Sequence, residues 1–162
     1  GEGPLRSELE NKKNALNLKD YVYFHGWVDD SNVSPVFSGN DDVDEILTGK
    51  LFRNFYGTAD LLLVTSRYEG YNRTIIEAMA LGCPVIMTDV GIAGEIVKND
   101  ENGIIIPVGD KNALKKAILH MYMNREYRER LSSNAQEIIE TLPIKTKEQY
   151  LQLYKQSFEQ CL

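Results

Sequence analysis

Residues 61–88 read LLLVTSRYEGYNRTIIEAMALGCPVIMT, and this stretch decides the fold that the sequence predicts. It begins with a short, continuously apolar run, 61–65, which is typical of a strand buried on both faces. A polar loop follows, and apolar residues then recur at helical spacing until Gly82, with Pro84 just beyond. A glycine after the last turn and a proline soon afterwards usually end a helix. Residues 84–88 predict the next strand, so the stretch predicts a strand, a loop, a helix and a second strand.

The rest of the chain extends this unit in both directions. Short apolar strands alternate with helices, which predicts an α/β fold: a Rossmann-like parallel sheet with helices on both faces and a helical C-terminal end. The further elements expected are a helix over 5–16, a strand over 21–28 with Tyr23 and Trp27 in the core, helices over 46–56 and 93–97, a strand over 103–107, helices capped by Asp110 and by Asn124, and a last helix over 150–162.

Composition places the chain among globular proteins. Its 162 residues are 43% hydrophobic and 26% charged, which suits one domain with a buried core. The net charge of −6 argues against a nucleic-acid partner, because a phosphate backbone is bound by clustered Lys and Arg. It leaves room for a small anion, since a few backbone amides at a helix end hold a phosphate even in an acidic protein.

Cysteine and histidine usage predicts neither a disulfide framework nor a metal site. The two cysteines, Cys83 and Cys161, lack metal-ligand spacing, and so do the two histidines, His25 and His120. A cytoplasmic location is therefore expected. The longest apolar stretch, 75–87, is interrupted by a glutamate, a glycine and a proline and predicts no membrane span. Peripheral association of a full-length protein with the inner face of the membrane stays open.

The loop after the 61–65 strand is the predicted ligand site. In an open parallel sheet, ligands bind at the carboxyl ends of the strands, in the loops that lead into helices. The loop 66–72 leads into a helix whose first amides lack intrahelical partners and, with the helix dipole, favour an anion such as a phosphate. Gly70 would let the backbone approach that ligand. Glu77 would reach the same crevice, where its two oxygens suit vicinal sugar hydroxyls.

Each of these residues also has an ordinary structural interpretation. The spacing of Glu69 and Glu77 recurs elsewhere in the chain, so the pair alone fits two surface charges. Gly70 fits a common turn glycine. Arg73 puts a cation in the first helical turn, against the dipole, at a cost of about 0.3–1 kcal/mol, and it either serves a site or is solvated. The loop at Ile92 fits a tight connection, because Ile92 breaks the glycine spacing of dinucleotide-binding loops.

Taken together, residues 66–86, SRYEGYNRTIIEAMALGCPVI, closely resemble the signature of retaining, nucleotide-sugar-dependent glycosyltransferases of family four, which have the two-domain GT-B architecture. Members carry Glu-Gly-aromatic, seven residues between two glutamates, and then Glu-Ala-Met-Ala-x-Gly-x-Pro-Val. The flanking pieces GEGPL at 1–5 and FHGWV at 24–28 also occur in the family's order. The resemblance covers most of residues 1–135. It identifies the chain as one half of a GT-B protein, the donor-binding C-terminal domain.

The resemblance implies a role for each part of this signature. Glu69 would be the catalytic residue and contact hydroxyls of the donor sugar, while Glu77 would bind the ribose hydroxyls. The donor would be a UDP-sugar or a GDP-sugar, and neither a metal nor another cofactor is expected. The remaining binding residues implied are Gly70, Tyr71, Asn72, Arg73 and Thr74 around the diphosphate, and Gly26, Trp27 and Val28 at the nucleobase.

The sequence is therefore interpreted as a nucleotide-sugar-binding domain over 1–162, truncated at its N-terminal side, with an insertion over 31–50. The expected activity of the longer chain is retaining sugar transfer to a glycan or lipid-linked acceptor, which a missing N-terminal domain would bind. Alone, the fragment is expected to be inactive. Ile92 stands where many members have a glycine, which departs from the family pattern. The alternatives are a sugar-nucleotide epimerase or starch-synthase-like enzyme of this architecture, or a non-catalytic module that has lost the ligand.

Overall fold

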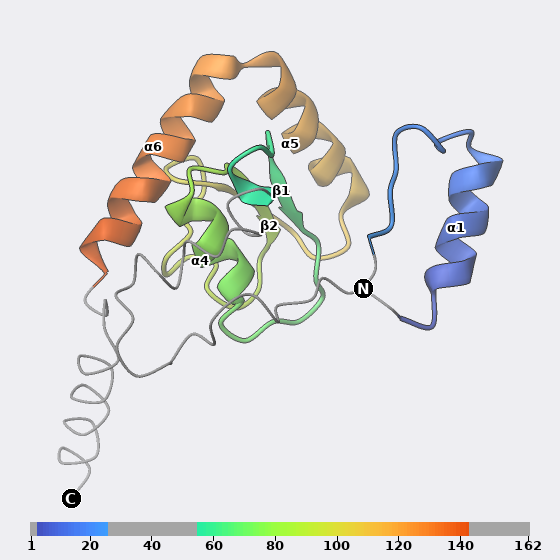
Figure 1. Cartoon of the computed structure of the whole chain (residues 1–162). Helices are drawn as coiled ribbons and strands as arrows, with labels where there is room; N and C mark the ends of the chain where they lie inside the picture. Colours follow the sequence, from blue (N-terminus) through green and yellow to red (C-terminus); the bar gives the residue numbers. More distant parts are fainter. Residues whose placement is uncertain (1–2, 26–54, 143–162) are drawn as a thin grey trace, which may run out of the picture. The chain divides into compact units, whose positions relative to one another are not determined.

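The computed structural model of the chain describes residues 3–25 and 55–142 (Figure 1). They belong to two compact units, Gly1–Asn32 and Val33–Leu162. Several expected features lie outside the described residues: the Gly26–Val28 strand end with Trp27, the insertion over 31–50, the helix over 46–56 except for its last two residues, and the helix over 150–162.

The first unit contains the helix α1 (Arg6–Ala15), which confirms the helix predicted after the glycine-rich turn. Arg6 contacts the segment that follows this helix. Its guanidinium donates a hydrogen bond to the carbonyl of Phe24 at 3.0 Å and lies 5.1 Å from the centroid of the Phe24 ring. A charge-assisted bond and a cation–π contact therefore hold the two ends of this unit's described part together.

The prediction of a strand over 21–28 is wrong for residues 21–25, which are the part of this range that the structure describes. Residues 21–25 have no strand geometry, and the side chains of Tyr21 and Tyr23 are 80% and 67% exposed, so Tyr23 is not a core residue. Aromatic and β-branched residues favour a strand where a neighbouring strand pairs with them. The described residues of this unit include a helix but no strand, so that partner is missing within it.

In the second unit, β1 (Leu62–Val64), β2 (Val85–Thr88) and β3 (Ile104–Ile106) form a parallel sheet in this order. Leu62 pairs with Val85, and Ile86 pairs with Ile104. The three strands confirm those predicted from the apolar runs. The helices around them are α4 (Arg73–Ala80), α5 (Lys111–Met123) and α6 (Arg125–Thr141).

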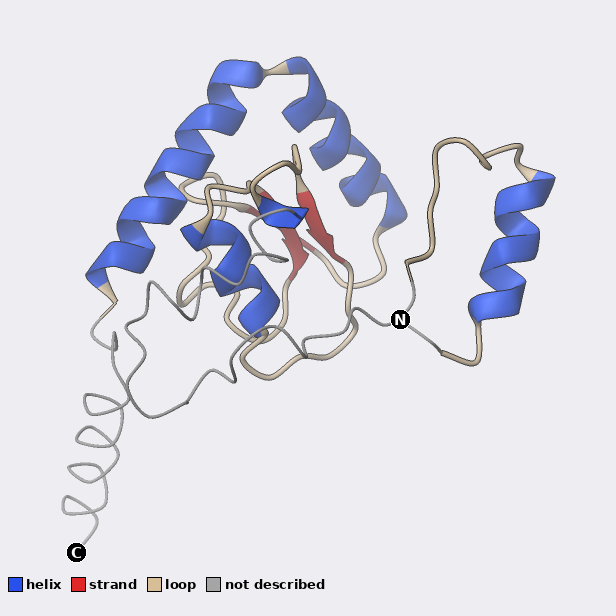
Figure 2. Ribbon diagram, viewed as in Figure 1, coloured by secondary structure: helices blue, strands red, loops and turns tan. Residues whose placement is uncertain are grey.

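The central strand β2 separates two apolar clusters, one on each face of the sheet. Val85 and Met87 point into the cluster that α4 covers, whereas Ile86 points into the cluster that α5 covers. The helix α6 contributes to both, with Ala135 in the first and Leu131 in the second. Figure 2 shows the sheet, in red, among these helices, in blue. This arrangement confirms the parallel sheet with helices on both faces, and it explains why every residue of β2 is buried.

The helix α4 ends as its sequence predicts. Gly82 has the left-handed φ of 72°, its amide donates to the carbonyl of Met79 at 3.0 Å, and the amide of Cys83 donates to the carbonyl of Ala78 at 2.8 Å. These two bonds form a Schellman motif, which satisfies the last carbonyls of the helix. The chain then turns directly into β2.

The short helix predicted over 93–97 is wrong. Gly91 and Gly94 have left-handed φ angles of 58° and 81°, so the backbone leaves the right-handed helical region twice within four residues. The amide of Gly94 donates instead to the carbonyl of Val97 at 2.8 Å, and Ala93 and Val97 form an isolated parallel bridge. The segment is a chain of tight turns between β2 and β3.

The two expected N-caps differ in what their side chains do. Asp110 Oδ1 accepts hydrogen bonds from the amides of Asn112 and Ala113, both at 2.9 Å, which confirms the cap of α5. Asn124 stands at the N-cap position of α6, but its side chain gives that helix no capping bond. Its amide nitrogen donates backwards, to the carbonyl of His120 at 3.0 Å, and so closes the end of α5.

The cap at Asp110 is testable by mutation. We expect Asp110→Ala to lower the free energy of unfolding by about 1 kcal/mol, because two helix-terminal amides lose their acceptor. Asp110→Asn keeps an oxygen in the same place and should lose much less. Urea denaturation of the three proteins measures the difference, and equal losses for Ala and Asn would contradict the cap as its cause.

A second mutation tests the packing of the loop after β2. A Cβ added at Gly91 would lie 2.3 Å from the carbonyl oxygen of Gly70, which is a backbone atom, whereas a Cβ at Gly94 would meet nothing within 4 Å. Both glycines have positive φ, so alanine strains the backbone at each. We expect Gly91→Ala to cost about 1–3 kcal/mol more stability than Gly94→Ala, the usual range for overpacking. Thermal unfolding monitored by circular dichroism compares them.

Candidate functional site

Three loops follow the carboxyl ends of the parallel strands and therefore meet at one edge of the sheet. They are residues 65–72 after β1, 89–103 after β2 and 107–110 after β3. In open parallel sheets this edge is where ligands bind. The candidate residues from Glu69 to Glu77 lie in the first of these loops and in the helix α4 that it enters.

The N-terminus of α4 presents several backbone donors. Within the described part of the chain, the amides of residues 70–74 donate to no acceptor, while the amide of Ile75 donates to the carbonyl of Asn72 at 3.2 Å. The helix dipole adds partial positive charge at the same place. Free amides and the helix dipole are features that favour an anion. That an anion binds at Gly70, Tyr71, Asn72, Arg73 and Thr74 stays a prediction.

Asn72 holds this turn in an uncommon conformation. It is the N-cap residue of α4, it has φ 44° and ψ 78°, and its side chain makes no capping hydrogen bond. Asparagine at an N-cap usually satisfies one of the free amides with its own oxygen. Here it leaves them to another acceptor, while the left-handed backbone costs about 1 kcal/mol that the surrounding structure must offset.

Gly70 is not required by the backbone of the turn. Its φ is outside the left-handed region, and a Cβ added there would meet no atom within 4 Å. The space beside its α-carbon is therefore open. An ordinary turn glycine is needed for its conformation, so this geometry favours the interpretation that the residue is small to let something approach.

Glu77 is largely covered and lies next to a cation. Its side chain is 15% exposed, and its Oε1 lies 3.5 Å from a guanidinium nitrogen of Arg73, one helical turn earlier. The Arg73 side chain is more than half exposed, so the pair is screened and contributes little stability. Arg73 thus turns toward the glutamate rather than toward bulk water alone. A surface-charge interpretation of Glu77 does not fit its burial.

Glu69 is held by residues that sequence reasoning did not single out. Ser66 donates from its hydroxyl to Glu69 Oε1 at 2.6 Å, and the hydroxyl of Thr88 donates to the carbonyl of Ser66 at 2.6 Å. From the loop after β2, Gly91 comes so close to this turn that a Cβ there would lie 3.3 Å from the Cβ of Glu69. The only sequence signal for these residues is their position at the ends of β1 and β2.

The structure brings Glu69 and the free amides into one turn, with Glu77 following in α4. It does not test the predicted nucleobase contacts, because Gly26, Trp27 and Val28 lie outside the described residues. Among residues 3–25 and 55–142, no group of three or more His, Cys, Asp or Glu could hold a metal ion. In the same residues, no helix is long and apolar enough to cross a membrane.

Cys83 is not a candidate nucleophile. Its thiol is buried between α4 and β2, and burial raises its pKa to about 11. The thiolate is the reactive form of cysteine, so this side chain stays protonated and inert at neutral pH. Burial and the raised pKa therefore both disfavour a role for Cys83 as a nucleophile.

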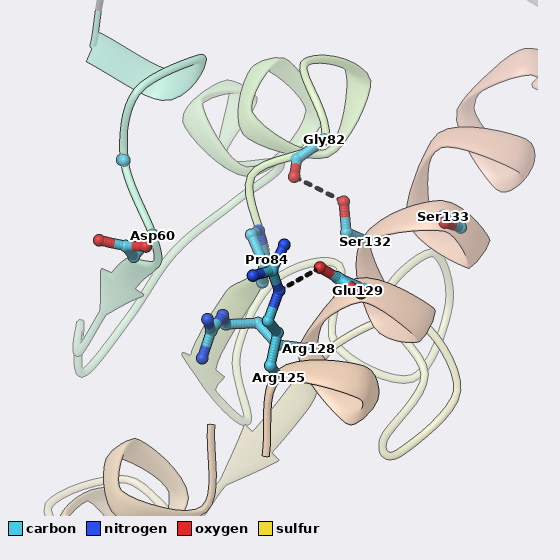
Figure 3. A pocket seen from close by; sticks show the side chains of 9 residues that line it. Asp60, Gly82, Pro84, Arg125, Arg128, Glu129, Ser132 and Ser133 are labelled. Carbon is cyan, nitrogen blue, oxygen red and sulfur yellow. Dashed lines mark hydrogen bonds and ion pairs between the residues drawn. The ribbon is translucent and has the colours of Figure 1, made fainter. Parts of the chain in front are cut away.

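A pocket of about 510 Å³ lies at the opposite end of the sheet, where β1 and β2 begin (Figure 3). Some of its polar groups are engaged with each other or with the backbone: Arg125 pairs with Glu129 at 2.6 Å, and Ser132 donates to the carbonyl of Gly82 at 2.6 Å. It is separate from the turn before α4. The lining residues are Ala59, Asp60, Gly82, Pro84, Arg125, Arg128, Glu129, Ser132 and Ser133.

The chain is similar to known proteins over most of its length. The sequence profile of the family described as "Glycosyl transferases group 1" matches residues 45–138. An uncharacterized glycosyltransferase of Methanocaldococcus jannaschii is 34% identical over 120 residues, which are 74% of this chain and 32% of that protein. A capsular polysaccharide biosynthesis glycosyltransferase of Staphylococcus aureus is 32% identical over 128 residues, 79% of this chain and 30% of that protein.

A solved structure agrees in fold. The Anabaena protein HepE in complex with UDP-glucose superposes with a TM-score of 0.66 at 26% identity, over 86% of this chain and 33% of that one. The fold predicted from the sequence, an α/β parallel sheet forming one half of a GT-B protein, is confirmed. This chain spans about a third of the length of each of these relatives. With more than half of its residues matched by the profile, the chain belongs to the glycosyl transferases group 1 family.

Proposed function

We propose that the chain is the donor-binding part of a glycosyltransferase and binds a nucleoside diphosphate sugar at the N-terminus of α4. The observation that carries the proposal is the set of amides at residues 70–74, which donate to no described acceptor at the carboxyl edge of the sheet. Family membership supports the same ligand, because the related HepE structure contains UDP-glucose. A UDP-sugar is therefore the first donor to test, and a GDP-sugar the second.

The free amides would act on the leaving group. When the sugar leaves its donor, negative charge grows on the diphosphate, and amides fixed in position stabilise that charge without reorganising. The α4 dipole adds to this stabilisation. Gly70 leaves open space beside its α-carbon, so the diphosphate approaches the backbone there.

The two glutamates would divide the donor between them. Glu69, in the turn, accepts hydrogen bonds from hydroxyls of the transferred sugar, and Glu77, one turn into α4, accepts them from the ribose. Transfer with retention at the anomeric carbon, to a glycan or lipid-linked acceptor, completes the proposal. The acceptor would be bound by a further part of a longer protein, so this chain alone binds the donor and does not turn over.

Binding can be measured on this chain directly. Titration with UDP, UDP-glucose, GDP and GDP-mannose, followed by amide chemical shifts, should perturb residues 69–77 at millimolar ligand. Shifts confined to the pocket at the amino end of the sheet, lined by Arg125 and Arg128, would place the ligand elsewhere. The absence of chemical-shift changes with all four ligands would contradict the proposal.

Gly70 gives the sharper mutational test. Because an added Cβ meets no protein atom, Gly70→Ala should leave the unfolding free energy unchanged within about 0.5 kcal/mol, the range of a neutral surface change. The same methyl group would occupy the space in which the diphosphate lies, so we expect affinity for UDP to fall about tenfold or more, as for a steric clash of one to two kcal/mol.

Ser133→Ala is the matched control for this mutation. Ser133 lines the pocket at the other end of the sheet, so its replacement should change neither stability nor affinity. If Gly70→Ala binds UDP as tightly as the unmodified chain does, the diphosphate does not lie against this turn.

A further inference from the structure

Two successive hydrogen bonds orient the carboxylate of Glu69. The first comes from a buried residue at the end of the central strand, and the second from the loop after β1. Thr88 is the last residue of β2 and is 2% exposed. Its Oγ1 donates to the carbonyl oxygen of Ser66 at 2.6 Å, in the loop after β1. The Ser66 hydroxyl then donates to Glu69 Oε1 at 2.6 Å.

We propose that Ser66 is a positioning residue for the donor sugar, which it serves by fixing the carboxylate of Glu69. The inference rests on the proposed function, in which Glu69 accepts hydrogen bonds from the sugar. Ser66 touches neither the sugar nor the diphosphate in this scheme. It acts through Glu69, and Thr88 acts through Ser66 by holding its backbone.

The hydrogen bonds and ion pairs around Glu69 support this role for Ser66. A serine hydroxyl is neutral, so it fixes the rotamer of a carboxylate without cancelling its charge. Among the described residues, Glu69 Oε2 receives no hydrogen bond, and no Lys or Arg forms an ion pair with Glu69. Glu77, by contrast, lies beside Arg73. Glu69 therefore keeps one oxygen without a described partner, available to hydroxyl groups of a ligand.

The backbone of Glu69 is fixed as well as its side chain. The close approach of Gly91 to Gly70 and Glu69 leaves this turn no room to move toward the loop after β2. A carboxylate held at both its backbone and its Oε1 atom is preorganised, so binding a sugar costs it little conformational entropy. Without the Ser66 hydroxyl, the Glu69 side chain would regain conformational freedom, and binding a sugar would cost more entropy.

The readout is the ratio of the dissociation constants for UDP and UDP-glucose, measured by calorimetry on the chain itself. The dissociation constant for UDP measures binding of the diphosphate by the free amides. The ratio of the two dissociation constants measures the added contribution of the sugar contacts. We expect Ser66→Ala to lower the preference for UDP-glucose about tenfold, the usual effect of losing a hydrogen bond to a charged group. The dissociation constant for UDP alone should hardly change.

Two further variants separate positioning from a purely structural role. Ser66→Thr keeps the hydroxyl and should restore the preference for UDP-glucose. Glu69→Ala should lower that preference by itself, and adding Ser66→Ala to it should then have no further effect, because alanine leaves no acceptor for the Ser66 hydroxyl. A circular-dichroism melt of each variant confirms that it folds.

The outcomes distinguish this inference from the proposed function. An unchanged ratio in Ser66→Ala overturns the inference, and so does an equal loss of affinity for UDP and UDP-glucose. Full additivity of Ser66→Ala and Glu69→Ala overturns it too. Equal binding of UDP and UDP-glucose by the unmodified chain removes the role of Glu69 but leaves the diphosphate site standing. Failure of the unmodified chain to bind UDP at all removes both.

Discussion

The parallel pairing of β1 with β2 is the constraint on which the rest of the structure depends. It places Val64 opposite Met87 and so brings the ends of the two strands to the same level. The turn before α4 and the loop after β2 then emerge side by side. Every feature of the candidate site follows from this: the contact of Gly91 with Gly70, the bond from Thr88 to Ser66, and the free amides of α4 at the exposed edge.

The strand pair β1–β2 serves both the core and the candidate site, through different atoms. The β2 side chains fill the clusters on both faces, while the last residue of the strand, Thr88, directs its hydroxyl to the neighbouring loop. A buried hydroxyl must find an acceptor, and here that acceptor is the backbone that carries Glu69. The hydrogen bond that satisfies this buried hydroxyl thus also helps to fix the candidate turn.

Local signals in the sequence were enough to predict the three described strands and the helices α4, α5 and α6 of the second unit, but not the turns over 93–97. The stop of α4 at Gly82 and the cap at Asp110 depend on residues within a few positions of each other, and both are confirmed. Tyr21 and Tyr23 show the opposite case, since their strand propensity is local but a strand also needs a partner. The site is divided in the same way: the free amides follow from where a helix begins, whereas the Thr88–Ser66 bond joins residues 22 positions apart and depends on strand register.

The cap of α5 has a consequence for the whole edge of the sheet. Two described helices, α4 and α5, start at this edge, and each could attract an anion by its dipole. At α5 the carboxylate of Asp110 already occupies the first amides and would repel a second negative group. At α4 Asn72 makes no such bond. Of these two helix ends, only the one at α4 therefore leaves its first amides open to an acceptor from outside the described residues.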